Sequence, residues 1–272
     1  MIKCRLLGLD IDGTIRNRDN IISDRVRLAV KKIQEMGVKV AILSGRPVYG
    51  MKETGKELGL DQYGGCLMAH NGAVILDCAT DRIIKRELLP MGQIIEYFCF
   101  AKEHGCNMLT YDDCYMVTND VTDQKIAHEA FVNGMTLKET KDFREYEHFP
   151  VSKVMIVGDP DRLLWMEQIG KEKYGPAVEC FRSEPYYLEI VPKGIHKGSS
   201  LAALADSLGI RQEEVAACGD GYNDLTMIQY AGFGAAMGNA QEEVKKAADY
   251  VTKSCEKDGA AELIELLCNH LT

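Results

Sequence analysis

The sequence lacks the features that mark several classes of protein. Its 10 cysteines form no C-x-x-C pair and it has only 6 histidines, so we expect no zinc site. It has no cluster of Lys and Arg, and its net charge of −9 argues against a nucleic-acid polymer as partner, because such partners require a basic surface. No apolar run approaches the length that spans a membrane, so we expect no membrane partner.

The sequence also indicates the cellular compartment and the number of domains. The first apolar stretch reaches Asp10 too soon for the apolar core of a signal peptide. Most cysteines lie in apolar runs, where cysteine behaves as a small hydrophobic residue, and a reducing, cytoplasmic compartment suits them best. With 272 residues, of which 46% are hydrophobic and 27% charged, the chain should form one or two globular domains.

Strands and helices alternate in the first sixty residues and in the last eighty. Apolar residues at helical spacing predict a helix over 23–37, which begins at Ser23 and ends at Gly37. The other helices expected in these regions cover residues 46–59, 197–209, 224–232, 240–248 and 259–269. The expected strands cover residues 4–10, 38–44, 214–220, 233–238 and 249–253. This alternation predicts an α/β fold with a Rossmann-like, doubly wound parallel sheet.

The middle of the chain has a different pattern. Residues 70–77 and 81–89 are expected to pair as a hairpin, and the short runs 106–113 and 114–119 should be antiparallel strands. Further helices are expected at 91–105 and 161–170, and further strands at 151–158, 177–183 and 186–191. We therefore expect an α+β domain of residues 83–189, inserted into a core domain made of residues 1–82 and 190–272.

Polar residues gather where the expected parallel strands end. The first strand runs into DIDGT at residues 10–14, the second into LSGR at 43–46, and a later strand into CGDGYND at 218–224; Lys197 precedes a helix. Alone, each of these reads as an ordinary turn, loop or solvated lysine. A calcium loop beginning at Asp10 would need a Glu where Ile21 stands. Because ligands of open α/β sheets bind beyond the carboxyl ends of the strands, the joint arrangement favours a binding site.

The two carboxylates of DIDGT suit the hydrolysis of a phosphate ester. Asp10 and Asp12 are two residues apart, so in an extended chain they point the same way. One can attack phosphorus, and the other can protonate the leaving alkoxide and later deprotonate water. A carboxylate that approaches a phosphate dianion meets a repulsion of roughly 8 kcal/mol at 4 Å and an effective dielectric constant of 20, so cations are required.

The other strand-end residues can supply the required charge and hydrogen bonds. Asp10 and Asp220 together form an oxygen-rich site that suits Mg²⁺, and Lys197 adds a second positive charge. Ser44 and the backbone amides around Ile11 and Gly45 can hold phosphate oxygens. Two further residues, Asn223 and Asp224, can orient metal-bound water or the lysine without contacting the substrate themselves.

The order and type of these residues resemble the four motifs of the haloacid dehalogenase (HAD) superfamily. The motifs are matched by DIDGT, LSGR, Lys197 in GIHKG, and GDGYND, and the flanking stretches HNGAVILD and YLEIVPKGIHKGSSL resemble the Cof-type hydrolases. The resemblance implies a HAD fold whose insert is a mobile cap. It also implies roles for five residues. Asp10 would be the nucleophile and Asp12 the general acid/base, while Ser44 and Lys197 would bind the phosphoryl group. Magnesium would be held by Asp10, Asp12 and Asp220.

The resemblance makes a magnesium-dependent phosphatase of small phosphorylated metabolites, such as sugar phosphates or nucleotides, the leading hypothesis. A phosphomutase of sugar phosphates and a non-catalytic phosphate-ligand sensor are the alternatives. The intact set Asp10, Asp12, Lys197 and Asp220 argues against the sensor. We expect a monomer or a weak homodimer.

Some positions depart from the usual pattern or bear on substrate choice. Arg16, His196 and Tyr222 stand where many HAD relatives carry other residue types. Arg16 and His196 could add charge near the site, although both are more readily explained as surface residues. Substrate selection is expected to lie in the insert, where the polar and aromatic candidates are Tyr111, Asp112, Asp113, Tyr115, Glu184, Tyr186 and Tyr187.

Overall fold

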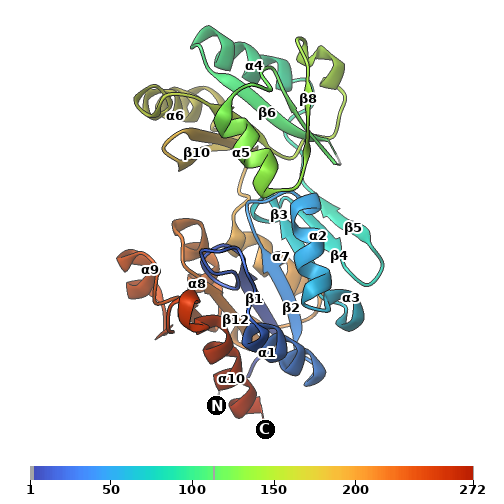
Figure 1. The fold of residues 1–272 in the computed structure, drawn as a ribbon, viewed down its shortest axis with the longest axis vertical. Helices are drawn as coiled ribbons and strands as arrows, with labels where there is room; N and C mark the ends of the chain where they lie inside the picture. Colours follow the sequence, from blue (N-terminus) through green and yellow to red (C-terminus); the bar gives the residue numbers. More distant parts are fainter. Residues whose placement is uncertain (1–2, 113, 272) are drawn as a thin grey trace. The chain divides into compact units, whose positions relative to one another are not determined.

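The computed structural model describes residues 3–112 and 114–271, and these form two compact units (Figure 1). The core unit comprises the described residues of Met1–Gly45, Lys52–Lys85 and His196–Thr272. The insert unit comprises those of Arg46–Met51 and Arg86–Ile195. The domain limits expected from the sequence, 83–189 for the insert, stay a prediction.

An eight-stranded sheet forms the centre of the core unit. Its strands, in sheet order, are β14 (Tyr250–Val251), β13 (Phe233–Ala236), β12 (Val215–Gly219), β1 (Leu6–Asp10), β2 (Lys39–Leu43), β3 (Cys66–Ala69), β4 (Val74–Asp77) and β5 (Arg82–Arg86). The strands from β14 to β3 pair in parallel, whereas β4 pairs antiparallel with β3. Every residue of β1 and of β12 is buried, as expected for parallel strands covered on both faces.

The order of the parallel strands fixes where a ligand can bind. In chain order the six parallel strands are arranged 3-2-1-4-5-6, which is the Rossmann order. The direction of winding reverses between β1 and β12, so the carboxyl ends of these two strands border the switch point at which such sheets bind ligands. The α/β, doubly wound fold class expected from the sequence is confirmed.

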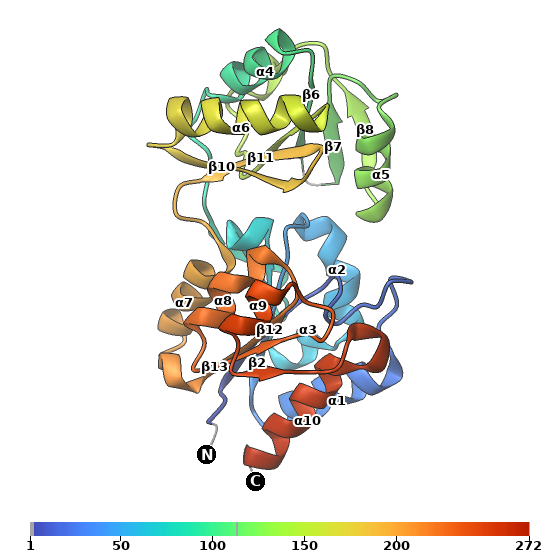
Figure 2. The same ribbon diagram turned by 90° about the vertical axis from the view of Figure 1, so that its left-hand side faces the viewer.

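Helices cover this sheet. They are α1 (Asp24–Glu35), α2 (Val48–Glu57), α3 (Leu60–Tyr63), α7 (Lys197–Ser207), α8 (Leu225–Tyr230), α9 (Glu242–Ala247) and α10 (Gly259–Leu271), with short 3₁₀ turns at η1 (His70–Gly72), η3 (Gln212–Glu214), η4 (Tyr222–Asp224) and η5 (Cys255–Lys257). Helix α1 packs against α10, and α7 packs against α8 (Figure 2). Helix α1 begins as predicted, because the Ser23 hydroxyl accepts a hydrogen bond from the amide of Val26.

The insert unit is built on a six-stranded sheet. In sheet order its strands are β10 (Val178–Glu184), β11 (Tyr187–Pro192), β9 (Val154–Val157), β6 (Asn107–Asp112), β7 (Tyr115–Thr118) and β8 (Thr136–Glu139). Its helices are α4 (Ile94–Glu103), α5 (Gln124–Val132) and α6 (Pro160–Tyr174), with a 3₁₀ turn at η2 (Phe143–Tyr146). Residues of α4 and α6 pack on one face of this sheet, and residues of α5 pack on the other.

The sequence assigned no structure to residues 120–150, where the insert unit has α5, β8 and η2. Strands β6 and β7 pair antiparallel, in agreement with the sequence. Within the described part of the chain, no helix combines the length and the apolar character that crossing a lipid bilayer requires.

Candidate active site

The meeting of β1 and α7 places the first pair of site residues. Asp10 is the last residue of β1, and Lys197 is the first residue of α7. One helical turn after Lys197, Leu201 packs where β1 has Gly8, since a Cβ at Gly8 would lie 3.0 Å from the Leu201 Cδ2 atom. Residues two apart on a strand and four apart on a helix share a face, so this contact brings Lys197 to Asp10.

Lys197 is held between two buried carboxylates. Its Nζ atom donates hydrogen bonds of 2.5 Å to Oδ1 of Asp10 and 2.5 Å to Oδ1 of Asp224, and its side chain has no exposed surface. Burial would lower the pKa of Lys197, but the two carboxylates outweigh it and raise that pKa, so the ammonium stays charged. The lysine therefore supplies a fixed positive charge at the end of β1.

Asp224 shapes the loop that follows β12. Its second oxygen, Oδ2, accepts hydrogen bonds of 2.9 Å from the backbone amides of Asp220 and Gly221. Asp224 is 1% exposed, and both of its oxygens are occupied by protein donors. The side chain therefore connects Lys197 with the backbone of the loop that carries Asp220, and the supporting role expected of Asp224 from the sequence stays a prediction.

Asp220 is oriented by a residue that the sequence analysis missed. The Nδ2 atom of Asn239 donates to Oδ2 of Asp220 and to the carbonyl of Gly13, each at 2.9 Å. Its Oδ1 atom accepts a 2.8 Å hydrogen bond from the amide of Cys255. Gly13 has φ of +77°, and a Cβ there would lie 2.3 Å from Oδ2 of Asp220, so only glycine fits this approach.

The donor set of the site fits a divalent cation. Oxygens of Asp10, Asp220 and Asp224 lie within 4.8 Å of one another, and Lys197 brings one positive charge to these three carboxylates. Burial, reinforced by the charge of Asp224, raises the pKa of Asp10 well above its usual range and that of Asp220 to about 6. Such shifts mark an excess of negative charge that a cation would neutralise. Because Asp224 is occupied by protein donors, Asp10 and Asp220 are the side chains that could bind Mg²⁺.

A series of hydrogen bonds connects the end of β2 with the loop that follows β12. The carbonyl of Ser44 accepts a 2.8 Å hydrogen bond from the amide of Asn71, and the side-chain oxygen of Asn71 accepts one of 3.3 Å from Asn223. Ser44 is 3% exposed and lies next to Leu43, which is the partner of Asp10 in the sheet register. Asn71 adopts a left-handed backbone conformation with φ of +57°. The sequence had not singled out Asn71.

The remaining predicted site residues lie in the turns after β1 and β2. Asp12 is exposed, and its charge contributes to the raised pKa values of both Asp10 and Asp220, so its carboxylate lies within electrostatic reach of the site. The side chain of Ile11 is buried, and its carbonyl accepts the amide of Arg16 at 2.9 Å, which closes the turn. Gly45 follows Ser44, and a Cβ on Gly45 would lie 3.8 Å from the side-chain oxygen Oδ1 of Asn71.

The three atypical residues have local contacts. Arg16 donates to Thr54 Oγ1 at 3.0 Å and pairs with Glu57 at 3.2 Å, which joins the DIDGT turn to α2. The other two are His196, which caps α7 by accepting the amide of Ser199 at 3.1 Å, and Tyr222, which is 60% exposed and donates to Glu243.

Of the residues expected to select substrate, two tyrosines are fixed inside the insert unit. The hydroxyl of Tyr111 donates to Oε1 of Glu129 at 3.3 Å, and that of Tyr187 donates to the carbonyl of Lys125 at 2.8 Å. Tyr115 is exposed, and Asp113 lies outside the described residues.

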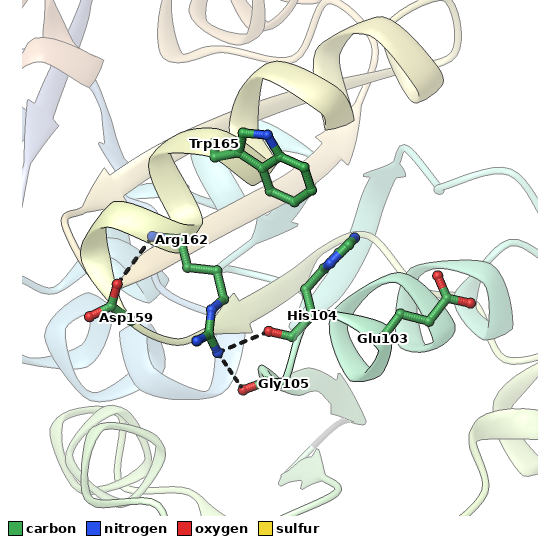
Figure 3. A pocket seen from close by; sticks show the side chains of 6 residues that line it. All are labelled: Glu103, His104, Gly105, Asp159, Arg162 and Trp165. Carbon is green, nitrogen blue, oxygen red and sulfur yellow. Dashed lines mark hydrogen bonds between the residues drawn. The ribbon is translucent and has the colours of Figure 1, made fainter.

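The insert unit has a pocket whose polar side chains are mostly engaged in contacts within the unit (Figure 3). It lies between the end of α4 and the start of α6, where Arg162 donates to the carbonyls of His104 at 3.0 Å and Gly105 at 3.4 Å. The rings of His104 and Trp165 meet edge to face, with their centroids 4.9 Å apart. Asp159, on the same rim, caps α6. These contacts join the two helices, and we assign the pocket no ligand.

Comparisons with known proteins agree with this arrangement. A family model described as haloacid dehalogenase-like hydrolase matches residues 7–264. A solved haloacid dehalogenase-like hydrolase from Bacteroides thetaiotaomicron is 42% identical, with a TM-score of 0.92, over 97% of this chain and 100% of its own. A Thermotoga maritima structure is 28% identical, with a TM-score of 0.84, over 97% of each chain.

A curated relative extends the comparison to a named enzyme. The 5-amino-6-(5-phospho-D-ribitylamino)uracil phosphatase YcsE of Bacillus subtilis is 30% identical over 97% of this chain and 95% of its own length. The family model and this relative each span both the core unit and the insert unit. The chain therefore belongs to the haloacid dehalogenase-like hydrolases.

Proposed function

We propose that the protein is a magnesium-dependent phosphatase that hydrolyses small phosphorylated metabolites through an aspartyl-phosphate on Asp10. The observation that carries this proposal is the buried arrangement of one ammonium between two carboxylates. Lys197 lies 2.5 Å from both Asp10 and Asp224, and oxygens of Asp10 and Asp220 lie within 4.8 Å of each other. The proposed nucleophile Asp10, the ammonium of Lys197 and the candidate magnesium ligands thus lie together at the switch point of the sheet.

The reaction has two balanced steps. In the first, the carboxylate of Asp10 attacks phosphorus, the bond to the leaving oxygen breaks, and Asp12 gives its proton to the departing alkoxide. In the second, water attacks the aspartyl-phosphate, Asp12 takes a proton from that water, and inorganic phosphate leaves with Asp10 restored. Asp12 suits the proton transfers because it is the exposed member of the pair, whereas Asp10 is 6% exposed.

Asp10, Asp220 and the backbone carbonyl of Asp12 are the groups that would hold Mg²⁺. When bound, Mg²⁺ supplies positive charge that lowers the repulsion between the Asp10 carboxylate and the phosphoryl group. Lys197 supports the same attack with a positive charge that is part of the protein itself, and the hydrogen bond from its Nζ atom to Asp224 keeps the ammonium in place. Asn239 holds the Asp220 carboxylate in its orientation.

The phosphoryl group itself needs hydrogen-bond donors on its oxygens. We assign this role to Lys197 and Ser44, to the backbone amides around Ile11 and Gly45, and to Asn223. The network from Ser44 through Asn71 to Asn223 supports this assignment, because it fixes the ends of β2 and β12 relative to each other. Preorganised donors of this kind stabilise charge that develops on phosphoryl oxygens.

We assign substrate choice to the insert, residues 83–189, acting as a cap domain. The Bacillus subtilis relative is named for a phosphorylated ribitylamino compound, which supports a small, soluble metabolite as substrate here. The cytoplasm is the compartment we propose, because all 10 cysteines are free and most are buried. A monomer or a weak homodimer is the proposed assembly.

The proposal is tested by phosphate release from p-nitrophenyl phosphate and a panel of metabolite phosphates, with Mg²⁺ or with EDTA. We expect Mg²⁺-dependent release, and we expect Asp10→Asn to reduce it by a factor of roughly 10³ or more, because the nucleophile is lost. The matched control is Asp24→Asn, whose side chain is 88% exposed on α1 and should leave the rate unchanged.

Three results would contradict the proposal. Full activity of Asp10→Asn or of the EDTA-treated enzyme would exclude the mechanism. Interconversion of sugar-phosphate isomers without release of phosphate would identify a phosphomutase. Binding of phosphate esters without any turnover would identify a sensor.

A further inference from the structure

A single arginine connects the turn that carries Asp12 with two other parts of the core unit. Arg16 follows this turn, and its side chain is 14% exposed. Its Nη1 atom donates a 2.6 Å hydrogen bond to the carbonyl of Asn20, and its Nη2 atom donates to Oγ1 of Thr54 at 3.0 Å and to Oε2 of Glu57 at 3.2 Å. The guanidinium thus links the loop after the turn to α2, through residues that all belong to the core unit.

The backbone of Arg16 holds the turn itself. Its amide donates to the carbonyl of Ile11 at 2.9 Å, and its carbonyl accepts the amide of Gly13 at 3.1 Å. These two hydrogen bonds flank Asp12 and form an isolated β-bridge between Asp12 and Arg16. They therefore fix the backbone from which the carboxylate of Asp12 extends.

The acceptors on α2 are held independently of this arginine. The second carboxylate oxygen of Glu57, Oε1, accepts a 2.7 Å hydrogen bond from Nη1 of Arg27 on α1. The same nitrogen of Arg27 donates to the carbonyl of Ile22 at 2.6 Å. Thr54 is 2% exposed, so packing holds its hydroxyl in place. Helices α1 and α2 thus present a fixed pair of acceptors to Arg16.

Two simpler roles for this arginine fit its contacts less well. An ion pair between exposed side chains contributes little, whereas the Arg16 side chain is mostly buried and its planar guanidinium bonds three acceptors in two segments. A direct contact with substrate is also disfavoured, because both terminal nitrogens are directed to acceptors in the loop and on α2. The contacts instead favour an effect through the turn that Arg16 holds.

We propose that Arg16 is a positioning residue for Asp12, because it holds the turn after β1 against α2 and so keeps the Asp12 carboxylate where it can protonate the leaving oxygen and later deprotonate water. This inference rests on the proposed phosphatase function. It concerns the two proton transfers and not the attack by Asp10, which is the last residue of β1 and is buried. A misplacement of about 1 Å can slow a reaction by roughly 100-fold, so the loss of these contacts should be measurable.

The test compares two esters of similar shape that differ in their need for a proton. p-Nitrophenolate leaves without a general acid, whereas the more basic phenolate of phenyl phosphate leaves faster when it is protonated. In Arg16→Met, kcat/KM for phenyl phosphate should fall by about tenfold or more, while kcat/KM for p-nitrophenyl phosphate should stay within about threefold of the wild type. The retained rate on p-nitrophenyl phosphate also shows that the variant is folded and that Asp10 still attacks.

A double-variant cycle tests whether the effect passes through Asp12. In the Asp12→Asn background the acid is already absent, so adding Arg16→Met should change kcat/KM for phenyl phosphate by no more than about twofold. Arg16→Lys keeps the charge but lacks the fork that reaches both the Asn20 carbonyl and α2, so it should show most of the loss. The matched control is Arg25→Met, which removes contacts of 3.0 and 2.7 Å with Glu265 elsewhere in the core unit and should leave both rates unchanged.

Four results would overturn the inference. Equal losses on both esters in Arg16→Met would indicate a structural role, and unchanged rates on both would indicate no role. An undiminished loss in the Asp12→Asn background would show that the effect does not pass through Asp12. Full activity of Arg16→Lys would show that charge, and not the position of the turn, is what matters. A wild type that hydrolyses neither ester would instead contradict the phosphatase proposal itself, and this inference with it.

Discussion

Three aspartates of the site have the same chemistry but different surroundings. Asp224 has both oxygens occupied, by Lys197 and by the amides at the start of the loop after β12. Asp10 shares one oxygen with Lys197, and Asp220 shares one with Asn239. The surroundings, rather than the residue type, therefore separate two candidate ligands from a positioning residue.

The raised pKa of Asp220 predicts a pH-dependent stability of the metal-free protein. Its pKa is about 6 in the folded chain, against an ordinary value of 3.8, because of burial and of Asp224. Below pH 3.8 the carboxyl is protonated whether the chain is folded or unfolded, and as pH rises through about 6 the folded state must carry a disfavoured charge. In EDTA, the stability of the wild type relative to Asp220→Asn should therefore fall across this window, as measured by urea unfolding.

The same comparison in excess Mg²⁺ checks that the effect belongs to the cation site. Above the window, Mg²⁺ should stabilise the wild type and should have a smaller effect on Asp220→Asn, because binding to the folded state adds stability. A difference between the two proteins that does not change with pH in EDTA would contradict the assigned environment of Asp220.

At the scale of elements, the site depends on how closely α7 approaches β1. Gly8→Ala should destabilise the protein by about 1–3 kcal/mol, because the added Cβ would lie 3.0 Å from Leu201 and 3.1 Å from Leu43 in a packed core. The contrasting variant is Gly55→Ala in α2, where the Cβ would lie at an ordinary 3.4 Å from Leu67 and the change should stabilise by roughly 0.5–1 kcal/mol. Urea unfolding of both variants measures the difference, and equal signs would contradict this account of the packing.

Elements with strong local signals could be predicted from the sequence. The strand that ends at Asp10 and the helix that begins after Ser23 have apolar patterns and end signals that do not depend on distant contacts. Helix α5 and strand β8 were missed because each is short, nine and four residues, and in β8 only Leu137 is partly buried while the other three residues are exposed.

Prediction of the site had a similar limit. The four motifs lie at strand ends or a helix start, where their residue types and order point to a common location. Asn71 and Asn239 are single asparagines in HNG and GNA, and no spacing relates them to the aspartates until the sheet brings their segments together. The contacts of Arg16 and His196 were likewise hidden, because they depend on side-chain geometry.

For the whole molecule, the chemistry and the proposed selectivity lie in different units. The predicted catalytic, phosphate-binding and metal-binding residues belong to the core unit, whereas the candidates for substrate selection belong to the insert unit. The family match at residues 7–264 covers both units. Under the proposed function, this division would let one phosphoryl-transfer site serve different substrates, because the insert could change its residues without altering the aspartates of the core unit.

The central claim is that Asp10 carries the phosphoryl group, and the most direct measurement is a rapid-quench reaction of Asp12→Asn with p-nitrophenyl phosphate and Mg²⁺. p-Nitrophenolate leaves without a general acid, whereas hydrolysis of the phosphoenzyme needs the base that this variant lacks. We predict a burst of about one p-nitrophenolate per enzyme, with a phosphoryl group on Asp10 in the mass spectrum of the quenched protein. A wild-type enzyme that turns over, combined with a variant that shows neither the burst nor a phosphorylated Asp10, would contradict the mechanism.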